Sequence, residues 1–270
     1  MRFLMCEPRH FAVNYEINPW MGPNIGRADP VVAHAQWDAL ADQLVRAGAT
    51  LDVMTSQPPD LPDLVFTANA AAVIGRRAFL SWFAKLERQP EHVLYGDALR
   101  KAGFEVDTRF VEARLPFEGA GDALQLHGGG LVIGWGFRTD LAAVDVLVDA
   151  VPGTPAVPAH LCNPHFYHLD TCFCPLPDGS ALWYPEAFTP DARAMLTEQF
   201  GPSRGIAVTV DEANEFACNA VEVGGRVFAH RWSGRLRRLL AARGFEAIAT
   251  DLSEFMRAGG SAKCLTLRLD

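Results

Sequence analysis

The feature that most constrains the fold of this 270-residue chain is an internal repeat. Three segments read alike, namely LVRAGATLDV (44–53), LRKAGFEVDT (99–108) and LAARGFEAIA (240–249). In each, a helical pattern ends at a basic residue, a glycine suited to closing a helix follows, and an alternating strand begins. Two weaker copies are VDAVPGTPAV (148–157) and EQFGPSRGIAVTV (198–210). The repeat glycines are Gly48, Gly103, Gly153, Gly205 and Gly244, at spacings of 55, 50, 52 and 39 residues.

A predicted strand pair precedes several of the copies. The pairs lie in AAAVIGRRAFL (70–80), GGLVIGWGFRT (129–139), SALWYPEAFT (180–189) and AVEVGGRVFAH (220–230). Each unit therefore reads as strand, strand, helix, strand, and a period of about 50 residues indicates an array of such units. Five units could close into a ring that protects sheet edges, as in propellers. Periodicity alone leaves a generic α/β sandwich with accidental similarity as the alternative.

The first predicted helix shows the local signals most clearly. Asp29 is placed to cap its start, and Pro30 suits the first helical position. One apolar face follows at helical spacing. That face consists of Trp37, Leu40, Ala41, Leu44 and Val45.

Composition narrows the class of protein. The chain is 49% hydrophobic and carries a formal net charge of −8, which is compatible with a cationic small substrate and argues against a general nucleic-acid binder. The N-terminal MRFLMCEPRHF lacks a signal-peptide pattern, and no run of about 18 apolar residues predicts a membrane span. We therefore expect a cytoplasmic protein that binds neither membrane nor nucleic acid.

The six cysteines are expected to be thiols in such a reducing compartment. Cys172 and Cys174 are two residues apart, and no CxxC pair exists in the sequence. This spacing argues against a structural zinc site.

Five short polar stretches interrupt apolar runs and could carry chemistry. They are YEINPWM (15–21) with Asn18, PDLVFTANAA (62–71) with Asp63 and Asn69, PFEGAGDALQL (116–126) with Glu118 and Asp122, FYHLDTCF (166–173) with His168 and Asp170, and GGSAKCLTLRLD (259–270) with Cys264. If FYHLDTCF is a strand, His168 and Asp170 point to the same face. If the C-terminal tail is a strand, Lys263 points away from Cys264 and need not activate it.

Each of these residues also has a purely structural interpretation. His168 and Asp170 could be a satisfied buried pair, and a lone cysteine is commonly a core residue. Arg88 and Arg138 are by default exposed cations. The glycine-rich FEGAGD turn lacks the phosphate-loop pattern, and its carboxylates would repel phosphate.

Taken together, the polar residues favour one chemistry. A cysteine, a histidine, carboxylates and amides lie in different repeats at similar element ends. Carboxylates can hold a guanidinium through charge-assisted hydrogen bonds. A thiol can then attack the electron-poor central carbon, while a histidine protonates the departing nitrogen and activates water.

On these motifs the chain resembles the guanidino-group-modifying enzymes, or penteins, which include arginine deiminases, dimethylargininases, amidinotransferases and arginine dihydrolases. The matching motifs span nearly the whole chain in order: CEPRHFAVNYEINPWM, DLVFTANA, RQPE, FEGAGDAL, GFRT, FYHLDTCF and GGSAKCLTL. The resemblance implies an α/β fold, the five-bladed β/α propeller, as a single catalytic domain over residues 1–270. It also implies that no metal or organic cofactor is needed.

The resemblance assigns roles to individual residues. It implies that Cys264 is the nucleophile, His168 the general acid and base, and Glu118 the catalytic carboxylate beside the histidine. The other implied positions are Asp170, which would grip the guanidinium, Arg88 and Arg138, which would bind the amino-acid carboxylate, Asn18, which would recognise substrate near the mouth, and the acidic motif residues Asp63 and Asp122.

One departure from the family pattern narrows the predicted reaction. Deiminases and dimethylargininases usually carry aspartate where this chain has Asn69. An amide brings a donor as well as an acceptor and carries no charge, so it suits a neutral ureido intermediate. The FTAN form resembles that of bacterial arginine dihydrolases, which implies conversion of arginine to ornithine, carbon dioxide and two ammonia.

Other functions remain alternatives at this stage. They are a dimethylargininase or deiminase that gives citrulline, an amidinotransferase, and a non-catalytic arginine-binding protein. In every case the partner is a small molecule, arginine or methylated arginine. The sequence does not decide between a monomer and a homo-oligomer.

Overall fold

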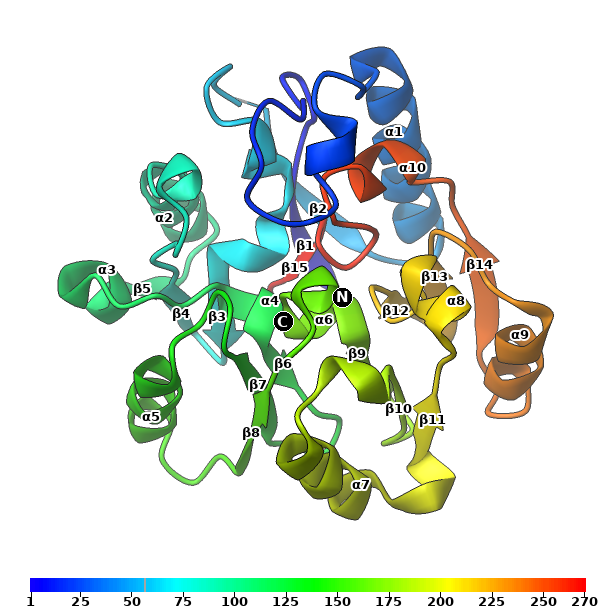
Figure 1. The fold of residues 1–270 in the computed structure, drawn as a ribbon. Coiled ribbons are helices and arrows are strands. Elements are labelled where there is room, and N and C mark those ends of the chain that lie inside the picture. The colour runs from blue at the N-terminus through cyan, green and yellow to red at the C-terminus, as the bar shows by residue number, and fades with distance from the viewer. Residues whose placement is uncertain (56) are drawn as a thin grey trace.

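The computed structural model describes residues 1–55 and 57–270 and contains five three-stranded sheets around one axis (Figure 1). The inner strands are β15 (Leu267–Arg268), β3 (Ala71–Ile74), β6 (Ala123–Gln125), β9 (Phe173–Pro175) and β12 (Val221–Val223). The middle strands are β1 (Arg2–Cys6), β4 (Arg77–Leu80), β7 (Leu131–Trp135), β10 (Ala181–Trp183) and β13 (Arg226–Ala229). The outer strands are β2 (Thr50–Met54), β5 (Glu105–Asp107), β8 (Ala156–His160), β11 (Gly205–Ala207) and β14 (Glu246–Ala249).

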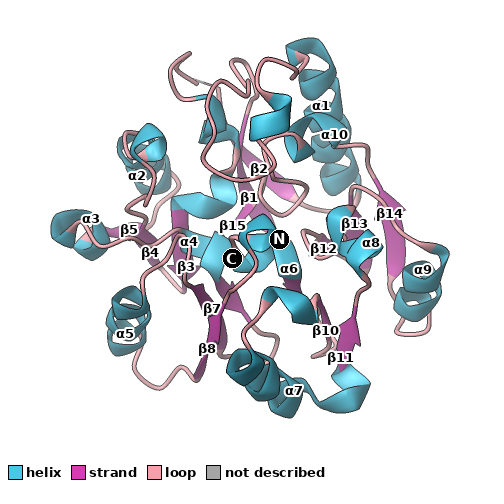
Figure 2. Cartoon of the chain, viewed as in Figure 1, coloured by secondary structure: helices cyan, strands magenta, loops and turns pink. Residues whose placement is uncertain are grey.

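All five sheets share one topology. The inner strand is antiparallel to the middle strand, and the middle strand is parallel to the outer strand. A parallel pair needs a crossover connection, and a helix supplies it in every unit. These helices are α1 (Pro30–Arg46), α2 (Glu91–Lys101), α5 (Leu141–Ala150), α7 (Pro190–Arg204) and α9 (Gly234–Ala241), and they lie at the periphery (Figure 2). The predicted α/β five-bladed propeller is confirmed.

Helix α1 forms for the reasons that the sequence indicated. The Asp29 side chain accepts hydrogen bonds from the backbone N–H groups of Val31 and Val32, and Pro30 is the first helical residue. Four of the five predicted face residues are buried: Trp37, Leu40, Ala41 and Leu44. The expectation was wrong for Val45, which is 52% exposed because it lies at the edge of the apolar face.

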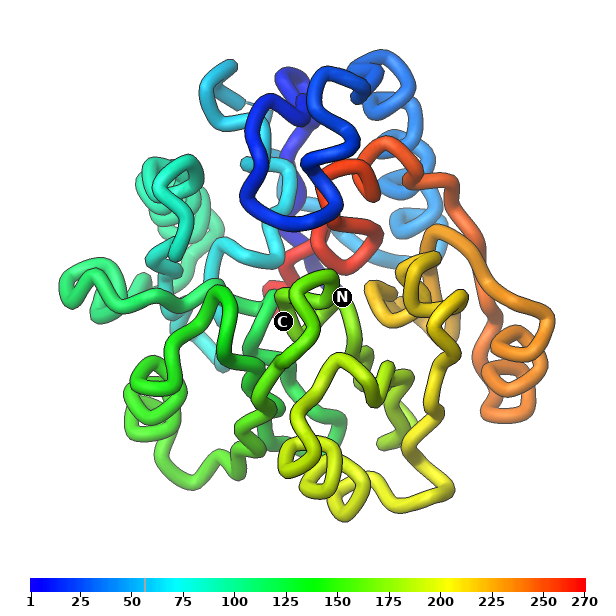
Figure 3. The backbone as a smooth tube through the Cα atoms, in the orientation of Figure 1, coloured from blue at the N-terminus to red at the C-terminus, as the bar shows by residue number. Residues whose placement is uncertain are grey.

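The ring closes by pairing the two ends of the chain. Strand β15 is antiparallel to β1, with Phe3 opposite Arg268 and Leu4 opposite Leu267. The Met1 amino group lies 3.4 Å from a carboxylate oxygen of Asp270. Figure 3 shows the N-terminal and C-terminal segments meeting near the axis. The first and last units therefore become neighbours, as ring closure predicts.

Two of the four predicted strand pairs were wrong. The segments 129–139 and 180–189 each contain only the middle strand, β7 or β10. Their inner partners, β6 and β9, lie upstream, across the loops 126–130 and 176–180. The hairpin loops in these units are longer than the two-residue turn of the β3–β4 pair, so a fixed window missed the first strand.

The fourth repeat also differs from its expected pattern. Gly205 was expected to close a helix in the left-handed conformation, but it begins β11 with an ordinary φ of −80°. Gly201 takes that conformation instead, at φ 62° inside α7, directly before Pro202. In the other four units the predicted glycine has a positive φ.

A single helical turn leads into each of three inner strands. Helix η3 (Thr67–Ala70) precedes β3, α4 (Gly119–Asp122) precedes β6, and α6 (Leu169–Cys172) precedes β9. Non-helical turns occupy the equivalent places before β12 and β15. These five turns converge on the axis, so residues on them come together from all five units.

Among the residues that the structure describes, no helix is both long and apolar enough to cross a membrane. The other short α-helices are α3 (Arg109–Ala113), α8 (Val210–Asn214) and α10 (Ser253–Met256), and the other 3₁₀ helices are η1 (Gly22–Asn24), η2 (Pro62–Val65), η4 (Leu86–Arg88), η5 (Pro164–Phe166) and η6 (Pro185–Ala187). All six cysteines are free thiols, and only Cys162 is exposed.

Candidate active site

A small pocket lies where the turns before the inner strands meet. Seven of the predicted site residues line it: Asn18, Asp63, Asn69, Arg88, Arg138, His168 and Cys264. Ile17, Phe66, Tyr167, Ala258, Gly259 and Gly260 complete the wall. The cavity volume is about 10 Å³, which is room for roughly one water molecule. A substrate of the size of arginine therefore requires the mouth to open.

Glu118 lies behind this pocket, directly against His168. Its Oε2 is 2.7 Å from His168 Nε2 and also accepts a hydrogen bond from Arg138 Nη1 at 3.3 Å. Burial by itself would raise the pKa of Glu118, but the Arg138 charge and the His168 hydrogen bond hold it at about 2. Because the carboxylate is an acceptor only, His168 Nε2 donates to it, which leaves Nδ1 as the nitrogen available to a ligand.

Cys264 lies on the turn before β15, with its thiol against Asp170. The Sγ is 3.4 Å from Asp170 Oδ2 and 3.7 Å from Oδ1. Burial and then the Asp170 charge raise the pKa of Cys264 well above its ordinary value. Burial also raises the pKa of Asp170 to about 7, and the charge of Lys263 is the largest influence that lowers it. Burial and the neighbouring carboxylate therefore favour the protonated thiol.

Asn219 is a site residue that the sequence interpretation missed. Its Nδ2 donates to Cys264 Sγ at 3.0 Å, and its Oδ1 accepts from the backbone N–H groups of Ser261 and Cys264. Asn219 lies two residues before β12, as Asn69 lies two residues before β3. Superposing the repeats NAAAVIG (69–75) and NAVEVG (219–224) would have found it.

The predicted strand carrying His168 and Asp170 was wrong. His168 immediately precedes α6 and Asp170 lies within that helical turn, so the two side chains are not on one face of a strand. His168 contacts Glu118, whereas Asp170 contacts Cys264. The tail after Cys264 was also overestimated, because β15 covers only Leu267–Arg268. Short apolar runs do not distinguish a strand from a turn that tertiary packing buries.

The orientation of the Asn69 amide is determined by its neighbour. Arg88 Nη1 donates to Asn69 Oδ1 at 2.8 Å, and an arginine cannot accept. The NH₂ group is therefore the free end of this pocket-lining amide, and Nδ2 has no hydrogen-bond partner among the described residues. Gly121 makes this possible, because a Cβ there would overlap the amide nitrogen.

Arg88 and Arg138 are both 3% exposed, so the default expectation of exposed cations was wrong. Arg88 makes two hydrogen bonds to the Glu91 carboxylate and one each to Asn69 and the Asp63 carbonyl. Those bonds use four of its five N–H groups.

Arg138 is less fully engaged than Arg88. It donates to Glu118 and to the Ile17 carbonyl and lies over the Tyr167 ring, 4.5 Å from its centre. It therefore keeps more free N–H donors than Arg88 does.

The mouth of the pocket joins three distant segments. Asn18 Nδ2 donates to the Tyr167 hydroxyl and to the Ala258 carbonyl, and the Tyr167 hydroxyl donates to the Gly259 carbonyl. Asp63 lies deeper, where Oδ2 accepts from the Tyr15 hydroxyl at 3.0 Å. Its Oδ1 has no hydrogen-bond partner among the residues described. The pocket thus offers an unused acceptor at Asp63 and an unused donor at Asn69.

Asp122 supports the turns rather than lining the pocket. It accepts hydrogen bonds from the Thr139 hydroxyl and the Leu169 backbone N–H. Burial raises the pKa of Asp122 to about 6.

Within residues 1–55 and 57–270, no three His, Cys, Asp or Glu side chains are grouped as metal ligands.

This geometry suits covalent catalysis on a polar carbon. A thiol held by an amide, a histidine oriented by an ionised carboxylate, and buried acceptor and donor groups converge on one small space. These are the components of nucleophilic attack followed by proton transfer to a leaving group.

Comparison with known proteins agrees with this chemistry. Residues 23–269 match the family model "N,N dimethylarginine dimethylhydrolase, eukaryotic". The chain is 41% identical over its whole length to the bifunctional arginine dihydrolase/ornithine cyclodeaminase AgrE of Nostoc sp., and it spans 38% of that protein. It is 37% identical to the N(G),N(G)-dimethylarginine dimethylaminohydrolase of Mycobacterium tuberculosis, covering 99% of this chain and 85% of that protein.

Solved structures show the same relationship. The N-terminal domain of the cyanobacterial arginine dihydrolase ArgZ, bound to substrate, superposes with a TM-score of 0.94 at 40% identity, covering 99% of this chain and 97% of that one. A dimethylarginine dimethylaminohydrolase adduct at 20% identity has a TM-score of 0.78 and shares the fold. The predicted family resemblance is confirmed: the chain belongs to the dimethylarginine dimethylaminohydrolase family of guanidino-group hydrolases.

Proposed function

We propose that this protein is a cysteine-dependent arginine dihydrolase that converts L-arginine and two water molecules to ornithine, carbon dioxide and two ammonia. The observation that carries the proposal is the Asn69 amide, which lines the same pocket as Cys264 and whose NH₂ group has no partner among the described residues. The similarity to AgrE and to the ArgZ domain supports the same reaction.

In the first hydrolysis, the arginine guanidinium binds in the pocket beside Cys264. Its charge lies against Asp170 and Asp63, and it favours ionisation of the thiol. The thiolate attacks the central carbon, and His168 protonates the nitrogen that leaves as ammonia. Water activated by His168 then releases a citrulline-like intermediate. Glu118 keeps the imidazole oriented throughout.

In the second hydrolysis, the bound intermediate is neutral and presents a ureido oxygen. The Asn69 NH₂ group can donate to that oxygen, whereas an ionised aspartate would repel it. Retention of the intermediate allows Cys264 to attack again. Among the proposed contacts with the amino-acid end, Arg138 and Asn18 have the better access, while Arg88 mainly orients Asn69.

We also propose that residues 1–270 act as one catalytic domain on a small-molecule substrate, without a metal or organic cofactor. The shared ring and its axial pocket support the first point, since the site draws on all five units. The six free thiols favour a reducing compartment, for which we propose the cytoplasm.

Product analysis after incubation with arginine tests the reaction. Ornithine and two equivalents of ammonia per arginine are expected. Citrulline as the sole final product would refute the dihydrolase and indicate a deiminase. Release of methylamines from methylated arginine, with arginine itself inert, would indicate the activity named for the Mycobacterium tuberculosis relative. Turnover that requires an added amine acceptor would indicate an amidinotransferase, and tight binding without turnover a binding protein.

The Asn69→Asp variant tests the role of the amide. We expect ornithine formation to fall by about tenfold or more while arginine consumption falls less, because the ureido oxygen loses its donor and meets a charge. The measurement is the ratio of ornithine to citrulline at early times. Asn14→Asp, at an exposed position, is the matched control. An equal loss of both products in Asn69→Asp would contradict the proposed role.

A further inference from the structure

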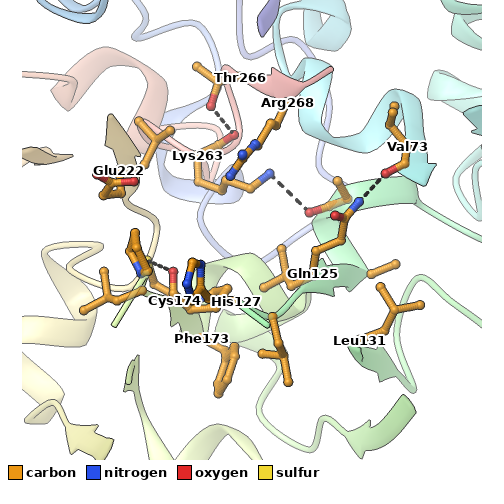
Figure 4. Close-up of a pocket in the computed structure, with 18 of the residues that line it drawn as sticks. Val73, Gln125, His127, Leu131, Phe173, Cys174, Glu222, Lys263, Thr266 and Arg268 are labelled. Atoms are coloured by element: carbon orange, nitrogen blue, oxygen red, sulfur yellow. Dashed lines mark hydrogen bonds between the residues drawn. The ribbon is translucent and has the colours of Figure 1, made fainter. Parts of the chain in front are cut away.

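A second cavity lies on the axis below the active-site turns. It has a volume of about 280 Å³ and is lined by residues of all five inner strands. Those strands follow the active-site turns in the chain, and Figure 4 shows side chains that line the cavity, which we call the channel. Its exposed lining residues are Gln125, His127, Gly128, Arg268 and Asp270, and they open it to solvent.

Lys263 stands at the boundary between this channel and the active site. It is the residue before Cys264, but its side chain extends into the channel, where Nζ donates to the Ala120 carbonyl at 3.3 Å (Figure 4). Ala120 lies on α4, between Glu118 and Asp122. Within the described part of the chain, no carboxylate lies within 4 Å of the Lys263 ammonium.

An ammonium group in this position, without a carboxylate partner, changes the electrostatic potential at the active site from the channel side. The negative charges that act on it most strongly are the Asp170 carboxylate and, when ionised, the Cys264 thiolate. The Lys263 charge lowers the pKa of both, against the larger effect of burial. Partial exposure to the channel lets water support the ammonium, although burial lowers its pKa.

The two hydrolyses of a dihydrolase differ in the charge of the ligand. During the first, the substrate guanidinium supplies a cation beside Cys264 and Asp170. During the second, the ureido intermediate is neutral, so that cation is gone. A thiolate 3.4 Å from a carboxylate then needs another positive charge.

We propose that Lys263 is the resident cation that keeps the Cys264 thiolate available for the second hydrolysis. This inference rests on the proposed dihydrolase function. Lys263 touches no reacting atom, because its side chain is in the channel, and it acts through Cys264 and Asp170. It is thus an electrostatic positioning residue for one of the two chemical steps.

The second hydrolysis begins at the Cys264 thiolate. The thiolate sulfur bonds to the ureido carbon, and the bond from that carbon to its terminal NH₂ breaks. The departing nitrogen takes a proton from His168 and leaves as ammonia. Water then attacks the resulting thiocarbamate with its proton passing to His168, and the carbon–sulfur bond breaks to regenerate the thiolate. The N-carboxy-ornithine that is released loses carbon dioxide and takes up a proton.

The other titratable or charged groups that line the channel are Cys174, Glu222, His127, Arg268 and Asp270. Burial raises the pKa of the Cys174 thiol to about 12, so it is neutral over the pH range of the test. Arg268 is already engaged, since its Nε donates to the backbone and side-chain oxygens of Asp270. It is therefore a matched control: a channel cation that is exposed and already paired with Asp270.

The test compares Lys263→Gln, Lys263→Arg and Arg268→Gln with the wild type on arginine, between pH 6 and 9. Glutamine keeps a donor for the Ala120 carbonyl and removes only the charge. In Lys263→Gln we expect the ornithine-to-citrulline ratio to fall about tenfold at pH 7 and to recover about one pH unit higher, because the thiol then ionises later. Lys263→Arg and Arg268→Gln should keep the wild-type ratio and pH profile.

The outcomes separate this inference from the function on which it rests. A wild type that stops at citrulline overturns both. A wild type that forms ornithine, with an unchanged ratio and pH profile in Lys263→Gln, overturns the role of Lys263 and leaves the dihydrolase intact. A loss in Lys263→Gln that a more alkaline pH does not restore also overturns it, because the hydrogen bond or the packing is then the cause.

Discussion

At the scale of single residues, the site contains buried polar and ionisable groups that lower the stability of the folded protein. Asp170 is fully buried, and its closest contacts are a thiol and the Asn219 amide through its backbone. Asn69 and Asp63 each keep a buried polar atom without a partner among the described residues. Such groups reduce stability unless a ligand satisfies them, so they are retained for binding and chemistry.

Replacing Asp170 with asparagine should therefore stabilise the protein while impairing turnover. Burial raises the pKa of Asp170 from 3.8 to about 7, so the folded state holds a proton that the unfolded chain releases. Stability is lost as pH rises from about 4 to 7. The Asp170→Asn variant avoids this loss, and we expect a gain of about 2–4 kcal/mol at pH 8 and less at pH 5. Urea unfolding at both pH values measures it.

Asp178→Asn is the control for this prediction. Against the effect of partial burial, the contacts with Ser180 and Arg243 hold the pKa of Asp178 below its ordinary value. Its replacement should therefore destabilise slightly at pH 8. If Asp170→Asn is instead less stable than the wild type at pH 8, Asp170 is favourably ionised in the folded state.

At the scale of elements, the helical turns before the inner strands carry the site. Three of the turns are four residues long and end where the strand begins. Their backbones approach one another so closely that side-chain size is restricted. At Gly121 on α4, an added Cβ would overlap the Asn69 amide on η3 and approach His168 Cδ2 to 3.6 Å.

The Gly121→Ala variant tests this close approach. Gly121 is not among the described glycines with a positive φ, so the effect is steric rather than conformational. We expect ornithine formation to fall by about tenfold or more, since Asn69 is displaced, and stability to fall by about 1–3 kcal/mol. Gly234→Ala is the control, because its nearest contact is an ordinary 3.6 Å. Unchanged products in Gly121→Ala would show that α4 and η3 can separate without cost.

At the scale of the whole molecule, ring closure places Cys264 in the site. Among the described strands, β15 pairs only with β1, through two residue pairs, and the Leu269 N–H adds a hydrogen bond to the Arg2 carbonyl. The thiol lies three residues before β15. The first blade therefore has to hold the last segment of the chain before the pocket is complete.

Joining the ends tests this arrangement. A circular permutant that links Asp270 to Met1 through a short Gly/Ser linker and opens between Pro152 and Gly153, in an exposed turn, should keep arginine turnover within about threefold, since the ring is preserved. A variant lacking residues 267–270 should lose turnover. Retained activity in the shortened variant, measured beside circular dichroism, would show that the β1–β15 pairing does not position Cys264.

The sequence by itself determined the repeat, the capped helix α1, the family and most of the pocket residues. These follow from local signals, such as Asp29 before Pro30, or from motifs whose residues are adjacent in the chain. It could not place residues whose roles depend on other units. Asn219 looked ordinary because its partners, Cys264 and Asp170, are 45 and 49 residues away.

Only the tertiary structure decided how the groups face one another. It turned the expected His168–Asp170 strand into a helical turn, buried Arg88 and Arg138, and left the Asn69 NH₂ group without a partner among the described residues. It also placed the Lys263 side chain in the channel and the neighbouring Cys264 side chain in the active-site pocket. The physical reason is that closing the ring brings five turns to one axis, where burial, hydrogen bonding and charge depend on neighbours from other units.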